Sequence, residues 1–188
     1  MTNESDFIKK LLNANQKDEA FKQLLNVYQE RLYWHIRKIV VTHENADDVL
    51  QNTFLRVYKS LPNFKQKSSL HTWMYRIAYN ESLRFIENNK KKLHYSLDDV
   101  NSFYLNNLVE DEFFDGDEIQ LKLHKILSKL PERQRQIFQM KYFDDLKFRE
   151  ISEILEIKEG TIKSAYYNIV NHIEKKIVSV ELFSETKV

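Results

Sequence analysis

The clearest periodic pattern in the chain lies near its C-terminus, where large apolar residues recur at helical spacing. Ile162, Tyr166, Ile169, Ile173 and Ile177 follow one another at steps of 4, 3, 4 and 4 residues. At about 100° per residue these side chains form one stripe along a helix. A second apolar pattern, over residues 146–155, is separated from this helix by a short turn. Together the two patterns predict a helix-turn-helix.

The side of the second predicted helix opposite the stripe is polar. An asparagine amide can pair with adenine through two hydrogen bonds, a lysine favours guanine or phosphate, and hydroxyls reach phosphates. A helix with one apolar face and one such polar face is typical of proteins that present a helix to nucleic acid. Its polar residues are Lys163, Ser164, Tyr167, Asn168, Asn171 and Lys175.

Residues 7–87 show further helical periodicity. A break near residue 43 precedes a helix that we expect Asn45 to cap, with Asp47 and Asp48 in the first turn, where the helix dipole favours acids. Pro62 should end that helix, and Ser69 should cap the next one. The apolar positions predicted to face the core are Phe21, Leu24, Leu25, Tyr28, Leu32, Leu50, Phe54, Val57, Tyr58, Leu61, Trp73, Ile77 and Ala78.

Composition supports a helical protein and narrows its class. Only two Gly and two Pro occur among 188 residues, and there is no Cys, so a disulfide framework and a thiolate metal site are excluded. The N-terminus lacks the pattern of a signal peptide, and no apolar run is long enough to span a membrane. The expected location is therefore the cytoplasm.

The net charge of +1 conceals a strongly uneven distribution. Residues 96–121 contain eight acids and no Lys or Arg, whereas the segments on both sides are basic. We therefore predict an all-α protein of two small helical domains, residues 1–95 and 118–188, joined by an acidic linker at 96–117. This linker could be a soluble spacer, or it could shield the basic domains from DNA.

Five motifs in this order resemble the extracytoplasmic-function (ECF) sigma factors, the two-domain members of the sigma-70 family. The resemblance covers residues 18–92 and 118–177. It implies a sigma-2-like N-terminal domain that binds core RNA polymerase and the −10 promoter element, and a sigma-4-like C-terminal domain that binds the −35 element. The motifs are ADDVLQNTFLRVY (46–58), SLHTWMYRIAYN (69–80), LPERQRQIF (130–138), EISEIL (150–155) and GTIKS (160–164).

The resemblance assigns candidate residues to each of these contacts. The outward face of the helix from residue 45 would dock on the polymerase through Asp47, Asp48, Gln51, Asn52, Leu55 and Arg56. The −10 contacts would come from Lys65, Lys67, Ser68, Tyr75, Arg76, Tyr79, Asn80 and Arg84. Tyr75 and Tyr79 belong either to the core or to the DNA contact, since stacked aromatic rings also suit unpaired bases. The −35 contacts would come from Thr161, Lys163, Ser164, Tyr167 and Asn168.

The chain departs from the family pattern at several of these places. Gln66 and Lys67 stand where Gly and an acid are common, Glu156 stands where the turn of the helix-turn-helix usually has Gly, and Lys158 replaces a serine cap. A non-glycine residue in a left-handed turn costs about 1–2 kcal/mol. Family members often have basic residues at positions 165, 168 and 170, where this chain has none. We therefore expect the C-terminal domain to rely on the polymerase for its DNA affinity.

Partners follow from the same resemblance, and catalysis has little support. We expect core RNA polymerase and promoter DNA as partners, and an anti-sigma factor, often membrane-anchored in this family. In the family the linker passes through the basic RNA-exit path of the polymerase.

The chain has no phosphate-binding glycine loop, no nucleophile elbow and no histidine spacing suited to a metal, so no cofactor is expected and an enzyme is disfavoured. The remaining alternative is a free-standing helix-turn-helix regulator that binds operator DNA.

Overall fold

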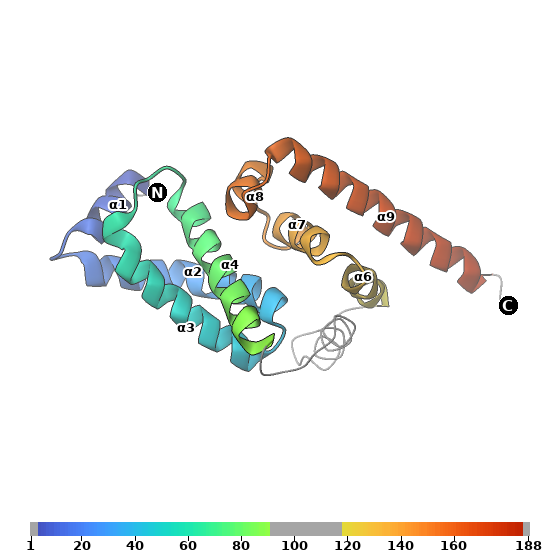
Figure 1. The fold of residues 1–188 in the computed structure, drawn as a ribbon, viewed down its shortest axis with the longest axis horizontal. Coiled ribbons are helices and arrows are strands. Elements are labelled where there is room, and N and C mark those ends of the chain that lie inside the picture. The colour runs from blue at the N-terminus through green and yellow to red at the C-terminus, as the bar shows by residue number, and fades with distance from the viewer. Residues whose placement is uncertain (1–3, 91–117, 186–188) are drawn as a thin grey trace. The chain divides into compact units, whose positions relative to one another are not determined.

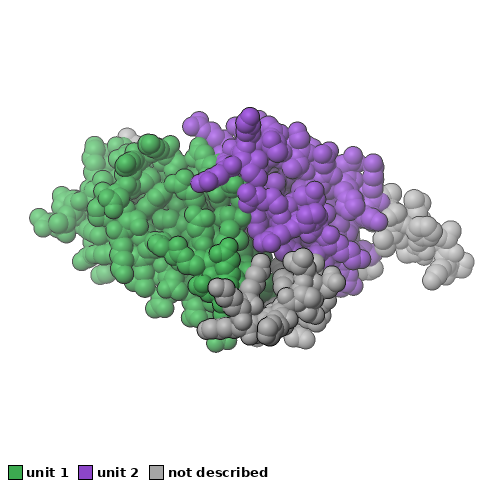
Figure 2. All heavy atoms as spheres, in the orientation of Figure 1, with its two compact units in different colours: residues 1–92, 153–155 green, residues 93–152, 156–188 purple. Residues whose placement is uncertain are grey.

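The computed structural model describes residues 4–90 and 118–185, and within these ranges every regular element is a helix (Figure 1). The prediction of an all-α protein is confirmed. The chain divides into two compact units (Figure 2). The first holds the described helices up to Lys90, and the second holds nearly all described residues from Glu118 on. The predicted linker 96–117 and both of its predicted boundaries lie outside the described residues.

The N-terminal unit is built on three long helices that all contact one another. Helix α1 packs on α2, and η1 continues directly from α3. Leu24, Leu32 and Ile36 of α2 are fully buried, as is Val57 of α3. The bounds are α1 Glu4–Leu12, α2 Lys17–Val40, α3 His43–Ser60, η1 Leu61–Asn63 and α4 Leu70–Lys90.

The start of α3 differs from the prediction that Asn45 caps it. Thr42 is the N-cap, because its hydroxyl accepts a hydrogen bond from the backbone N–H of Asn45 at 3.2 Å. The Asn45 side chain instead donates to the carbonyl of Val40 at 3.3 Å. Threonine and asparagine are both good capping residues, so local preference did not separate them. As a result Asp47 and Asp48 lie in the second turn of α3 and not in the first.

The start of α4 agrees with the prediction. The Ser69 hydroxyl accepts a hydrogen bond from the backbone N–H of Thr72 at 3.1 Å, which is the contact of an N-cap. Trp73, predicted to be a core residue, is only partly buried, and its ring centroid lies 4.7 Å from that of Phe64. Because α4 packs against both α2 and α3, its buried arc extends to Met74 and Ala78.

The C-terminal unit packs α6 and α7 against the long helix α9. A cluster of buried side chains, Leu127, Phe138, Ile169 and Ile173, joins the three helices. Ile162 is fully buried, and Tyr166 and Ile177 are partly buried, so the predicted apolar stripe does face the core. The bounds are α6 Glu118–Ser128, α7 Glu132–Tyr142, α8 Phe148–Leu155 and α9 Glu159–Glu185.

The turn between α8 and α9 has the left-handed conformation that the family pattern suggested. Glu156 has φ 56° and ψ 39°. The backbone N–H groups of Glu156 and Ile157 both donate to the carbonyl of Ser152, and the Ser152 hydroxyl donates to the carbonyl of Ile157 at 2.5 Å. These hydrogen bonds satisfy polar groups at the helix end and hold a non-glycine residue in a conformation that costs about 1–2 kcal/mol.

Candidate nucleic-acid interface

The five residues predicted to contact the −35 element share one exposed face of α9. Their side chains point away from the face that carries Ile162 and Ile169, which are at most 2% exposed. Tyr167 is 62% exposed. The apolar stripe therefore fixes the rotation of α9, and this rotation leaves the polar face outward. The exposed residues are Thr161, Lys163, Ser164, Tyr167 and Asn168.

Lys163 is not a free cation, because its Nζ lies 2.7 Å from a carboxylate oxygen of Glu159. The two residues are one helical turn apart, an arrangement that stabilises helices and weakens the field that Lys163 presents to a phosphate. Sequence reasoning did not use Glu159, although a Glu followed four residues later by a Lys is a recognisable pattern.

An aromatic cluster supports the same face from behind. The ring of Phe148, the first residue of α8, lies 5.5 Å from that of Tyr166 and 6.1 Å from that of Tyr167. Partial burial raises the pKa of the Tyr166 phenol above its ordinary value, and the neighbouring Tyr142 and Tyr167 raise it further. Phe148 was missed in the sequence because an isolated aromatic at a helix start carries no periodicity.

The loop between η1 and α4 presents the cations predicted for the −10 contact. Lys65 and Lys67 are exposed and Ser68 is partly buried. Gln66 has φ 53°, a left-handed conformation that a glycine would adopt without strain. The loop therefore keeps the backbone shape suited to glycine although this chain has glutamine.

Two side chains fix the point where this loop enters α4. Ser69 caps the helix, and Glu4 of α1 accepts a hydrogen bond from the backbone N–H of Leu70 at 2.8 Å. The same carboxylate also raises the pKa of the Tyr28 phenol, an effect second to that of burial. Nothing in the periodicity of the sequence indicated that Glu4 reaches this helix.

The exposed side of α4 holds three of the predicted −10 residues, but not the tyrosines. Tyr75 is 2% exposed and Tyr79 is 4% exposed, so both belong to the core. The Tyr75 ring lies 4.9 Å from His35 and 4.6 Å from His71. Of the two interpretations left open by the sequence, burial supports the core. Asn80 and Arg84 are exposed, and Arg76 is partly buried.

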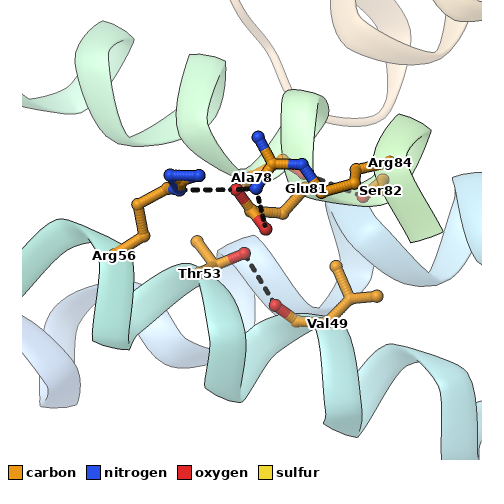
Figure 3. A network of polar contacts seen from close by, with 7 residues as sticks. All are labelled: Val49, Thr53, Arg56, Ala78, Glu81, Ser82 and Arg84. Atoms are coloured by element: carbon orange, nitrogen blue, oxygen red, sulfur yellow. Dashed lines mark hydrogen bonds and ion pairs between the residues drawn. The ribbon is translucent and has the colours of Figure 1, made fainter.

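The predicted polymerase-docking face of α3 is exposed along its length. Leu55 is 52% exposed, and it is the apolar residue of an otherwise polar face. Arg56 also belongs to a network with α4: its Nε lies 2.7 Å from Glu81, and Glu81 is 3.0 Å from Arg84 (Figure 3). The Glu81 side chain is only 11% exposed. It thus links a residue of the docking face to a residue of the predicted −10 face. The other exposed members are Asp47, Asp48, Gln51 and Asn52.

The described residues hold neither a group of three potential metal ligands nor a helix apolar and long enough to cross a bilayer. The exposed faces of α3, α4 and α9 and the loop before α4 present hydrogen-bond donors, cations and exposed aromatic rings.

Comparison with known proteins decides the family. The model of sigma-70 region 2 matches residues 24–92 and the model of sigma-70 region 4 matches residues 120–173. The chain is also 28% identical over 183 residues to the ECF RNA polymerase sigma factor SigW of Bacillus subtilis, covering 90% of this chain and 96% of that protein. The chain belongs to the ECF group of the sigma-70 family.

Further relatives agree with this assignment. The RNA polymerase sigma-H factor of Pseudomonas aeruginosa is 28% identical over 175 residues, which cover 84% of this chain and 86% of that protein. Among solved structures, the sigma factor RpoE of Bartonella quintana, in complex with the anti-sigma factor NepR, superposes with a TM-score of 0.66 at 20% identity over 84% of this chain and 96% of that chain. This likeness concerns the fold. Sigma factors are not enzymes.

In this sigma factor the region 2 match begins within α2 and includes α3 and α4. The region 4 match runs from α6 to the first half of α9. Helix α1 precedes the region 2 match, so the Glu4 hydrogen bond joins a segment outside the family pattern to the helix that follows the loop between η1 and α4.

Proposed function

We propose that this sigma factor brings core RNA polymerase to specific promoters, with the N-terminal unit engaging the polymerase and the −10 element and the C-terminal unit reading the −35 element. The observation that supports this most directly is the rotation of α9, which buries Ile162 and Ile169 and turns Tyr167 and Asn168 outward. A duplex reader needs such a polar face on a helix that is fixed from behind.

For the −35 element, each exposed residue of α9 has a contact that suits its chemistry. Asn168 can pair with adenine through two hydrogen bonds, while Thr161 and Ser164 suit phosphate oxygens. Lys163 can contact phosphate or guanine once it leaves Glu159. Few cations lie on this face, so we expect the isolated C-terminal unit to bind DNA weakly and with little dependence on salt.

For the −10 element, the proposed surface is the cationic loop together with the exposed side of α4. Lys65, Lys67 and Ser68 lie on the loop, and Arg76, Asn80 and Arg84 lie on the helix. With Tyr75 and Tyr79 in the core, the partly exposed ring of Trp73 is the aromatic that we propose for contact with an unpaired base, because it packs on Phe64 where the loop begins. Stacking on such a ring contributes about 1–3 kcal/mol per base.

For the polymerase, we propose the face of α3 around Leu55. An exposed apolar side chain within a ring of polar groups is a common anchor of protein interfaces. An anti-sigma factor is a further proposed partner, supported by the Bartonella quintana sigma factor, whose solved structure contains one. Core polymerase and promoters place the site of action in the cytoplasm.

The experiment that tests this function combines the full chain with bacterial core RNA polymerase. Co-elution on a sizing column measures association, and run-off transcription from a library of upstream regions reads both promoter elements. We expect Leu55→Arg to abolish co-elution and Val27→Arg to preserve it, since Val27 is equally apolar and 59% exposed on α2. A chain that binds specific DNA but never associates with core polymerase would instead be a free-standing helix-turn-helix regulator.

A further inference from the structure

The C-terminal unit has a groove between α6 and the end of α9 that the proposed DNA contacts do not use. Its volume is about 350 Å³. Ile126 of α6 and Ile177 of α9 give it an apolar floor. Lys122, Lys125 and Lys129 line it from α6, and Lys176 lines it from α9. His172 completes the wall, and no acid is among the described residues that line the groove.

The combination of an apolar floor and a basic rim selects the kind of occupant. Lysine side chains can cover apolar surface with their aliphatic stems while their ammonium groups remain in water. A nucleic acid would complement the positive charge of the rim but leave the isoleucine floor without an apolar partner. A polypeptide segment that carries both carboxylates and large apolar side chains satisfies both parts of the groove.

Such a segment lies directly before α6 in the same chain. Residues 109–117 contain five acids and no basic residue, and they also contain Phe113 and Phe114. We propose that this segment of the chain's own linker binds in the groove between α6 and α9 in the free protein, with its phenylalanines over Ile126 and Ile177 and its carboxylates near the lysine rim. This inference does not rest on the proposed function.

Reach and covalent connection favour this occupant over a second copy of the chain. Lys122 and Lys129 are about 10 Å apart along α6, given a rise of about 1.5 Å per residue. Nine residues can extend over about 30 Å, so a chain that reverses direction before Glu118 spans the whole groove. The entropic cost of closing such a short loop is small and grows slowly with its length. The short covalent connection also gives the segment an effective concentration at the groove of order mM.

The test uses the full chain labelled for NMR and follows the backbone amide shifts of residues 122–129 and 172–177. We expect the double substitution E110Q/E112Q to shift these amides. The matched double substitution D98N/D99N removes the same charge from the far end of the linker and should leave them unchanged. High salt should reproduce the E110Q/E112Q spectrum, because the contact is partly electrostatic.

A charge exchange makes the test specific. K125E/K129E changes two exposed lysines of the groove. In this background E110Q/E112Q should no longer shift the groove amides. Combining K125E/K129E with E110K/E112K reverses both charges and should restore the parent-like amide shifts. Three outcomes would overturn the proposal. The two linker substitutions could shift the groove amides equally, or these shifts could depend on protein concentration, which would indicate a second copy of the chain. The groove amides could also respond only to added core polymerase. None of these outcomes bears on whether the chain directs transcription.

Discussion

The Glu4 carboxylate accepts a hydrogen bond from the backbone N–H of Leu70 at 2.8 Å, although the two residues are 66 positions apart. Leu70 is the first residue of α4, where backbone N–H groups have no partner within the helix. A carboxylate is well suited to this place, because the helix dipole is positive there. Helix α1 thereby supports the end of the loop between η1 and α4, which carries the predicted −10 residues Lys65 and Lys67.

Removing the Glu4 side chain should therefore destabilise the N-terminal unit. We expect Glu4→Ala to lower the free energy of unfolding by about 1 kcal/mol, the usual effect of losing a helix cap. Glu4→Gln keeps an acceptor oxygen and should retain part of this stability. Urea denaturation measures both, with Glu30→Ala, an exposed position in the middle of α2, as the control. Equal stabilities of Glu4→Ala and the control would contradict the capping role.

Tyr75 and Tyr167 should respond to truncation in opposite ways. Tyr75 is 2% exposed, so Tyr75→Ala should cost about 3–5 kcal/mol of stability, as for other large buried aromatic residues. Tyr167 is 62% exposed, so Tyr167→Ala should change stability by less than about 0.5 kcal/mol. Thermal unfolding measures the first effect, and promoter binding by the polymerase complex should detect a loss only in the second variant. If the Tyr75→Ala protein were stable but its polymerase complex bound the −10 element poorly, Tyr75 would be a DNA-contacting residue and not a core residue.

Relaxing the left-handed turn between α8 and α9 should stabilise the C-terminal unit. Glu156→Gly removes the Cβ from a residue at φ 56° and should raise stability by about 1 kcal/mol. Glu153→Gly, within the regular part of α8, should lower it by about 1 kcal/mol, the usual cost of glycine in a helix. Differential scanning calorimetry resolves such changes. A Glu156→Gly protein no more stable than its parent would show that the left-handed turn is unstrained.

Releasing Lys163 from Glu159 should strengthen DNA binding. Glu159→Gln breaks the 2.7 Å ion pair and leaves the cation available to a phosphate, so promoter affinity should rise and its salt dependence should steepen by about one unit of slope. Glu174→Gln makes the same charge change at an exposed position farther along α9 and is the control. Filter binding of the polymerase complex over a salt series gives both slopes. If Glu159→Gln and Glu174→Gln changed the salt-dependence slope equally, the effect would come from net charge alone and not from the release of Lys163.

Much of the fold could be read from local patterns. The stripe from Ile162 to Ile177 predicted both α9 and its buried face, and Ser69 was correctly predicted to cap α4. These features follow from helical periodicity and from the capping preference of serine, which depend on near neighbours in the chain. The cap of α3 was assigned to Asn45 and belongs to Thr42, since two good capping residues lie three positions apart and only the packed geometry selects one.

The candidate site was predictable in part for the same reason. The exposed face of α9 follows directly from its stripe, and the predicted docking face of α3 is the complement of its apolar side. Tyr75 and Tyr79 could not be assigned from spacing, because α4 packs on both α2 and α3 and its buried arc is wider than a single stripe.

The sequence by itself determined the helical class, the family and the faces of the helices, because each is encoded in residues close together along the chain. Only the tertiary structure decided that Glu4 accepts a hydrogen bond from the first residue of α4, that Glu81 joins Arg56 to Arg84, and that the two tyrosines of α4 are buried. Those relationships depend on which helices pack against each other, and packing brings together residues whose distance in sequence carries no periodic pattern.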